Sequence, residues 1–85
     1  MTRQRAERIR AEMESNPNGQ RFGLLCNVLE AFGIRLDRQK GSDCIFKHET
    51  LNVRLFISYH GSGRVHAAYV ERAVKAMNEV KELGQ

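Results

Sequence analysis

Three histidines, His48, His60 and His66, are the side chains of this sequence best suited to proton transfer. The pKa of an imidazole lies near neutral pH, so a histidine can serve there as an acid or as a base. Residues 61–64, Gly-Ser-Gly-Arg, lie between His60 and His66 and precede a predicted helix. The backbone amides of such a segment can bind a phosphate group, and its arginine would add a positive charge. The alternative interpretation of these residues is an exposed, flexible connection.

The overall charge favours a negatively charged partner. The 85 residues carry a formal net charge of +4, and the pI is about 9.5. Such a charge attracts nucleic acid or an acidic protein surface, but a solvated basic surface without a partner explains it equally well. Hydrophobic residues make up 41% and charged residues 28%, which is typical of a globular protein rather than of a disordered chain. The length predicts one domain with a small core.

The cysteines and the hydropathy pattern predict a cytoplasmic protein. Cys26 and Cys44 form no Cys-x-x-Cys pair, and the histidines add no spacing typical of zinc ligands. We therefore predict two reduced thiols in the core and neither a metal nor another cofactor. No apolar run approaches the length of a membrane span, and no segment resembles a signal peptide, so we expect no membrane association.

Composition and apolar spacing predict three helices. Residues 2–15 have helix-forming composition, but arginines crowd their first half, where the helix dipole disfavours cations. Their apolar stripe has only three members, Ala6, Ile9 and Met13. We therefore expect a marginal helix, ordered on contact with another surface. Residues 20–32 and 67–83 form more regular amphipathic helices, and Gly33 supplies the stop of the first of these.

Alternation of apolar and polar residues predicts three strands, at 34–37, 44–47 and 53–58. With a two-residue turn at 41–42, apolar residues of one strand would lie opposite polar residues of the other. A shift of one residue turns every side chain of a strand to the other face of the sheet. We therefore predict a three-residue loop that contains glycine. The open face of the sheet then carries the following residues: Arg35, Asp43, Ile45, Lys47, Arg54 and Phe56.

Residues 38–48, Arg-Gln-Lys-Gly-Ser-Asp-Cys-Ile-Phe-Lys-His, form a basic strand, a Gly-Ser turn and a second strand. This segment resembles the signature hairpin of the HicA family of small RNA-cleaving toxins. In that family Gly-Ser is followed by a histidine and then by a strand that contains an aromatic residue. Phe46 occupies the aromatic position here, whereas Asp43 stands in place of the histidine. The resemblance covers roughly residues 21–77.

Resemblance to the HicA family implies a double-stranded-RNA-binding-like α+β fold. This fold has the order α-β-β-β-α and a three-stranded antiparallel sheet with helices on one face. Residues 20–83 would form that domain, and residues 1–19 an additional N-terminal helical extension. The resemblance also implies metal-independent binding and cleavage of messenger RNA in the cytoplasm. It further implies neutralisation by a small antitoxin protein of the HicB type, which covers the active face.

Within this resemblance, His60 and Asp43 are the candidate catalytic residues. His60 matches a histidine often found at the end of the third strand in the family. Alternation along that strand directs its side chain to the open face. The equal alternative is a loop histidine that is exposed by chance. Asp43 would be a weak base and a poor acid at neutral pH and would repel a phosphate, so we favour a role in capping the Gly41-Ser42 turn. We expect His48 at a solvent-exposed edge and His66 as a weak helix cap.

The predicted RNA-binding surface combines cations, the hairpin turn and an aromatic residue. Its members are Arg38, Lys40, Gly41, Ser42, Lys47, Arg54, Phe56 and Arg64. Phe56 could stack on a base or be covered by a partner protein, and we slightly favour the protein. Three interpretations stay open: a HicA-like toxin with weakened or relocated catalysis, a catalytically inactive RNA-binding module, and a protein-interaction domain.

Overall fold

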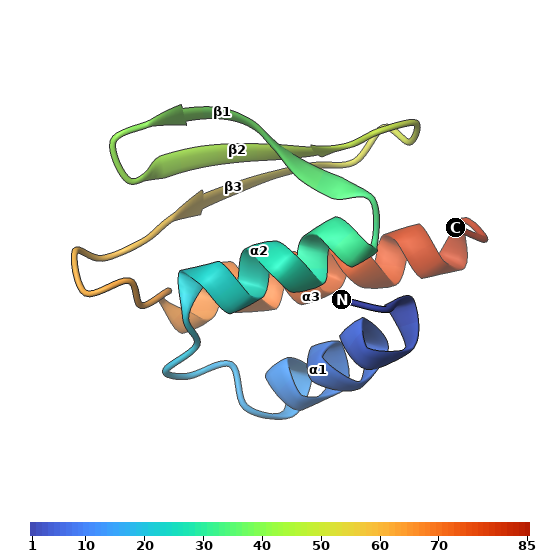
Figure 1. The fold of residues 1–85 in the computed structure, drawn as a ribbon, viewed down its shortest axis with the longest axis horizontal. Helices are drawn as coiled ribbons and strands as arrows, with labels where there is room; N and C mark the ends of the chain where they lie inside the picture. The colour runs from blue at the N-terminus through green and yellow to red at the C-terminus, as the bar shows by residue number, and fades with distance from the viewer.

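The computed structural model describes residues 1–85 and arranges them in three layers (Figure 1). The elements are α1 (Arg3–Ser15), α2 (Phe22–Ala31), β1 (Ile34–Lys40), β2 (Asp43–His48), β3 (Arg54–Ser58) and α3 (Ala67–Glu82). The strands form one antiparallel sheet in the order β1-β2-β3. Helices α2 and α3 cover one face of it, and α1 lies beneath these two helices, away from the sheet. The predicted α+β fold with an extra N-terminal helix is confirmed. None of the helices is long and apolar enough to cross a membrane.

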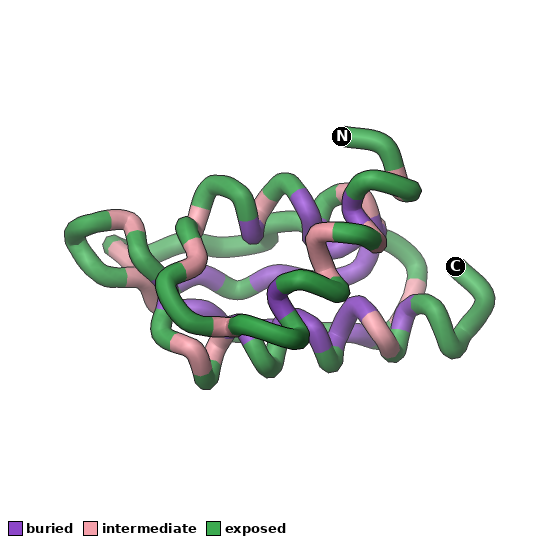
Figure 2. The backbone as a smooth tube through the Cα atoms, turned by 90° about the horizontal axis from the view of Figure 1, so that it is seen from below, coloured by how far each residue is buried: buried purple, intermediate pink, exposed green.

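The core lies between the sheet and the helix pair, where the buried segments face one another (Figure 2). Strand β2 alternates strictly: Cys44, Phe46 and His48 are buried, and the residues between them are exposed. Helices α2 and α3 contribute apolar residues at intervals of three and four, as amphipathic helices do. The largest fully buried side chains come from all three layers and include Met13, Leu25, Phe32, Ile34 and Phe46. One face of the sheet is therefore filled by packing, and the other is left open.

The first hairpin turns more tightly than predicted. Lys40 pairs with Asp43, so that Gly41 and Ser42 form a two-residue turn. Gly41 has a φ of +62°, and a positive φ at the first central position is the glycine position of a type II′ turn. The predicted three-residue loop is therefore wrong.

A β-bulge at Asp37 explains why the tight turn does not mix the faces. On one side of the bulge Leu36 pairs with Phe46, which is the register that a three-residue loop would give. On the other side Arg38 pairs with Ile45, and the register has shifted by one residue. The extra residue is absorbed inside the strand rather than at the turn. As a result, the second half of β1 directs different side chains to the open face than strict alternation predicted.

Helix α1 is ordered by contact with the protein's own helices α2 and α3. Met13 is buried, and the guanidinium of Arg3 lies 4.0 Å from the centre of the Phe32 ring. Arg10 donates a hydrogen bond of 2.9 Å to the side-chain oxygen of Asn78 on α3. The helix was expected to be ordered by contact with another surface, and helices α2 and α3 of the same chain form that surface. The division of the chain at residue 19 stays a prediction.

Both cysteines are free thiols, Cys44 in the core and Cys26 packed against it. Burial raises the pKa of the Cys26 thiol to about 11, and Cys44 and Glu30 add smaller contributions. Burial also raises the pKa of the Cys44 thiol, and the Asp43 carboxylate adds to the effect. Because the thiolate is the reactive form, both side chains are weak nucleophiles at neutral pH.

Candidate functional site

The face of the sheet that no helix covers, named the outer face below, arranges its side chains in three rows across the strands. In the order β1-β2-β3 the rows are Arg35-Lys47-Arg54, Arg38-Ile45-Phe56 and Lys40-Asp43-Ser58. All of these residues are exposed except Ser58, which is half-buried. The six positions that alternation placed on the open face are confirmed there, and the bulge adds Arg38 and Lys40 to them.

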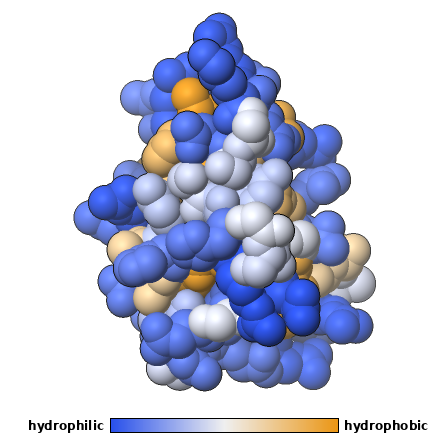
Figure 3. Space-filling model, turned by 90° about the vertical axis from the view of Figure 1, so that its left-hand side faces the viewer, coloured by the Kyte–Doolittle hydropathy of each residue, from blue (hydrophilic) through white to orange (hydrophobic).

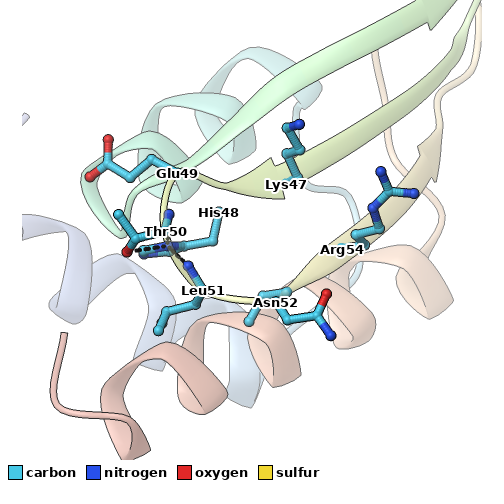
Figure 4. A pocket seen from close by; sticks show the side chains of 8 residues that line it. Lys47, His48, Glu49, Thr50, Leu51, Asn52 and Arg54 are labelled. Carbon is cyan, nitrogen blue, oxygen red and sulfur yellow. Dashed lines mark hydrogen bonds between the residues drawn. The ribbon is translucent and has the colours of Figure 1, made fainter.

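The first row concentrates positive charge. Lys47 lies between Arg35 and Arg54, and Figure 4 shows Lys47 and Arg54 pointing to the same side of the sheet. Like charges opposed across strands destabilise a sheet. Asp37 lies 3.7 Å from the Lys47 ammonium and Glu49 lies 3.7 Å from the Arg35 guanidinium, whereas Arg54 has no acidic partner. Since exposed ion pairs contribute little, the row keeps a positive potential suited to a polyanion.

The second row exposes apolar surface beside a cation. Phe56 is 43% exposed and Ile45 36% exposed. The Phe56 ring meets the ring of Tyr69 on α3 edge to face, with centroids 5.9 Å apart. The guanidinium of Arg72 lies 5.4 Å from the centre of the Tyr69 ring. Phe56 is thus an exposed ring supported from the side by the half-buried Tyr69, and an exposed ring with flanking cations is the arrangement on which unpaired bases stack.

The third row lies next to the hairpin turn. The hydroxyl of Ser58 donates a hydrogen bond of 2.8 Å to the carboxylate of Asp43. Asp43 therefore contacts its cross-strand neighbour and does not cap the turn, because the register brings Ser58 directly opposite. The carbonyl of Ser42 accepts a hydrogen bond of 3.2 Å from the Tyr59 amide, which ties the turn to the end of β3. This end of the molecule faces the viewer in Figure 3 and is mainly hydrophilic.

Two of the histidines have structural partners. His48 is only 6% exposed, and its Nδ1 accepts hydrogen bonds of 3.0 Å from the amides of Thr50 and Leu51 (Figure 4). The prediction of an exposed edge position is wrong, because the turn between β2 and β3 folds over this ring and uses it to satisfy two backbone donors. His66 caps α3 as predicted, since its Nδ1 accepts a hydrogen bond of 3.2 Å from the Ala68 amide.

The loop between β3 and α3 is held by its own hydrogen bonds. The amide of His60 donates to the carbonyl of Arg64 over 2.9 Å, and the amide of Gly63 donates to the carbonyl of His60 over 2.8 Å. The Arg64 guanidinium donates to the carbonyl of Gly19, in the segment before α2. Arg64 therefore lies apart from the outer face, and its contact with RNA stays a prediction. The ring of His60 is exposed.

A cleft of about 400 Å³ adjoins the outer face where β3 ends and α3 begins. Its lining residues are Ser58, Tyr59, His60, His66, Ala68, Tyr69 and Arg72. A second groove of about 250 Å³ continues along α3 and brings Arg72 and Lys75 next to Arg54 and Phe56. No group of three His, Cys, Asp or Glu side chains comes together as metal ligands.

Tyr69 and Arg72 are the functional candidates that the sequence analysis missed. Their spacing of three places them on one side of a helix, and this is the only signal in the sequence. The same spacing occurs between many residues of α3. Only the packing of α3 beside β3 shows which of its faces borders the sheet.

A family model described as "HicA toxin of bacterial toxin-antitoxin" matches residues 25–78. The match begins within α2, includes all three strands and ends within α3, so that α1 lies outside it. No curated protein and no solved structure matches the chain. The matched segment covers more than half of the chain and contains the outer face and the cleft. The chain therefore belongs to the HicA family of toxins from bacterial toxin–antitoxin systems.

Proposed function

We propose that this protein acts on messenger RNA in the cytoplasm through its outer face and the adjoining cleft, as the toxin of a toxin–antitoxin pair. The observation that carries the proposal is the cross-strand row Arg35-Lys47-Arg54. This row is incompletely neutralised and lies beside the exposed ring of Phe56. Cations that bind phosphates next to an aromatic ring that stacks on a base are the two parts of a single-strand RNA site. Membership of the HicA family supports RNA as the polyanion.

Each part of this surface has a proposed role. RNA binding is assigned to Arg38, Lys40, Gly41, Ser42, Lys47, Arg54, Phe56 and Arg64, and proton transfer to His60. Asp43 lies next to the cleft through its hydrogen bond with Ser58. A carboxylate is a poor proton donor at neutral pH. Endonucleolytic cleavage is therefore expected to be slow, because one histidine does the work that two such groups usually share.

Replacing Lys47 and Arg54 together by alanine is expected to weaken RNA binding and to flatten its dependence on salt. Each phosphate contact on a single strand contributes about 0.7 to the slope of log K against log salt, so two lost contacts lower that slope by about 1.4. Fluorescence anisotropy of a labelled single-stranded RNA between about 50 and 200 mM salt measures both quantities.

The matched control is the double variant Arg5→Ala, Arg8→Ala. These two arginines are exposed on α1, on the opposite side of the molecule, and the variant has the same net charge. Its affinity and its salt slope should stay close to those of the wild type. Equal losses in the two double variants would show that binding depends on net charge alone, and the outer face would then not be the site.

We also propose that a small antitoxin of the HicB type covers the same outer face. Ile45 and Phe56 lie side by side in the middle row and expose an aliphatic and an aromatic side chain. Such residues become anchors when a partner removes water from them. The surrounding cations fit an acidic partner. The antitoxin should therefore displace labelled RNA from the toxin in an anisotropy titration. A ternary complex of toxin, antitoxin and RNA would contradict a shared surface.

A further inference from the structure

The cleft between the end of β3 and the start of α3 brings two histidines to one place. His60 and His66 both line it, and none of its 7 lining residues is acidic. The loop that joins them folds back on itself: Tyr59 forms a β-bridge with Val65, and the amide of His60 donates to the carbonyl of Arg64 over 2.9 Å. The backbone at both histidines is thus held in place by hydrogen bonds within the loop.

The two histidines differ in what they can do. Nδ1 of His66 accepts the hydrogen bond of the Ala68 amide. The neutral ring therefore carries its proton on Nε2 and can donate a hydrogen bond from there. The exposed ring of His60 has no such partner and can take up or release a proton. One ring is suited to binding an anion, and the other to proton transfer.

Arg72 adds a cation to the same cleft. Its guanidinium lies 5.4 Å from the ring of Tyr69 and forms no ion pair with an acidic side chain. Tyr69 contacts Phe56, with ring centroids 5.9 Å apart. The aromatic edge of the outer face therefore leads directly into the cleft. Arg72 lines both the groove that contains Phe56 and the cleft that contains His66, so an RNA strand with a base on Phe56 can continue into the cleft.

We propose that this cleft binds the scissile phosphodiester of single-stranded RNA, with His66 and Arg72 as phosphate-binding residues and His60 as the catalytic residue. This inference rests on the function proposed above and locates its chemistry. The 2′-oxygen attacks phosphorus, the new O2′–P bond forms, and the P–O5′ bond breaks. His60 takes the proton of the 2′-hydroxyl, and the 5′-oxygen takes a proton from solvent. The products are a 2′,3′-cyclic phosphate and a 5′-hydroxyl, and no further reactant is consumed.

The test measures cleavage and binding separately with the full chain. Cleavage of a labelled single-stranded RNA is followed in the presence of chelator, with identification of the product ends. Binding is measured with the 2′-O-methyl form of the same RNA, which cannot be cleaved by its 2′-oxygen. The variants are His60→Ala, His66→Asn and Arg72→Gln. Asparagine is a good N-cap, so His66→Asn keeps the cap of α3 and removes the ring. Arg8→Gln, which removes an exposed cation of α1 on the side of the molecule away from the sheet, is the control.

We expect His60→Ala to lower the cleavage rate by at least about 10²-fold, the usual contribution of a proton-transfer group, with little change in binding. His66→Asn and Arg72→Gln should each lower the cleavage rate by about 10²-fold, the usual effect of one lost donor to a developing anion. Arg8→Gln should cleave nearly as fast as the wild type.

The contrary outcomes separate the two proposals. Undiminished cleavage by His60→Ala, or salt-sensitive binding without any cleavage by the wild type, would overturn the cleft as the site of chemistry and leave the RNA-binding outer face intact. Absence of both binding and cleavage would overturn the RNA-acting function itself.

Discussion

The variant Asp43→His is expected to cleave RNA about 10²–10⁴-fold faster than the wild type, which is the range that one well-placed acid–base group contributes. Position 43 opens β2 on the outer face, and its side chain reaches Ser58, which lines the cleft that holds His60. An imidazole there would supply the second proton-transfer group that the wild type lacks. It would also remove a carboxylate that repels the phosphate backbone. The HicA resemblance implies a histidine directly after the Gly-Ser turn, so the turn is expected to accept one.

The matched control is Asp43→Asn, which removes the negative charge without adding a titratable group. Its cleavage rate should stay within several-fold of the wild-type rate, because the variant only loses a negative charge that repels the phosphate backbone. The rates of both variants are measured against pH, and only Asp43→His should gain a new ionisation near neutral pH. If the two variants cleave equally fast, position 43 acts through charge alone and takes no part in proton transfer.

Gly33→Ala is expected to lower the free energy of unfolding by about 2–5 kcal/mol. Gly33 joins α2 to β1 with a φ of +77°, and an alanine side chain there would place its Cβ 2.7 Å from Nε2 of His48. The left-handed conformation contributes about 1–2 kcal/mol of this loss, and the overlap with a packed ring contributes about 1–3 kcal/mol. The His48 ring cannot move aside without losing its hydrogen bonds with the amides of Thr50 and Leu51.

Gly41→Ala isolates the conformational part of this effect. Gly41 has a φ of +62°, but an added Cβ would meet no atom within 4 Å. Its loss should be about 1–2 kcal/mol. Urea denaturation gives the free energies of unfolding of both variants. Equal losses of unfolding free energy in the two variants would show that the His48 ring moves aside without destabilising the protein. A smaller effect of Gly33→Ala in a His48→Ala background would confirm that the two residues are coupled.

Local patterns were sufficient to predict most of the fold. The intervals of three and four in α2 and α3 and the alternation in β2 reflect which side chains must be buried, and the structure has the same buried faces. Gly33 could be predicted as the stop of α2 because a left-handed residue after a helix is usually glycine. These features depend on residues that are neighbours in the sequence.

The features that could not be predicted depend on distant parts of the chain. The alternation of apolar and polar residues in the first two strands shows that the hairpin must accommodate one residue more than a two-residue turn allows. Either a longer loop or a bulge at Asp37 can accommodate it, and both satisfy the same alternation. Alternation in β2 assigns His48 to the core face of the sheet, but its burial depends on the turn between β2 and β3, which folds over it. Arg64 carries the charge that a phosphate site needs, but the carbonyl of Gly19 is its partner. The cleft exists only because α3 packs beside β3.

The bulge at Asp37 has a consequence for how this hairpin can vary among related chains. Every other residue of β1 has a partner on β2, from Ile34 with His48 to Lys40 with Asp43. Deleting Asp37 would therefore keep the ladder, the tight turn and both faces of the sheet. It would remove only the carboxylate that lies 3.7 Å from Lys47. In evolutionary terms, related chains can gain or lose a residue at position 37. The charge of the outer face then changes, while the pairing of the hairpin stays the same.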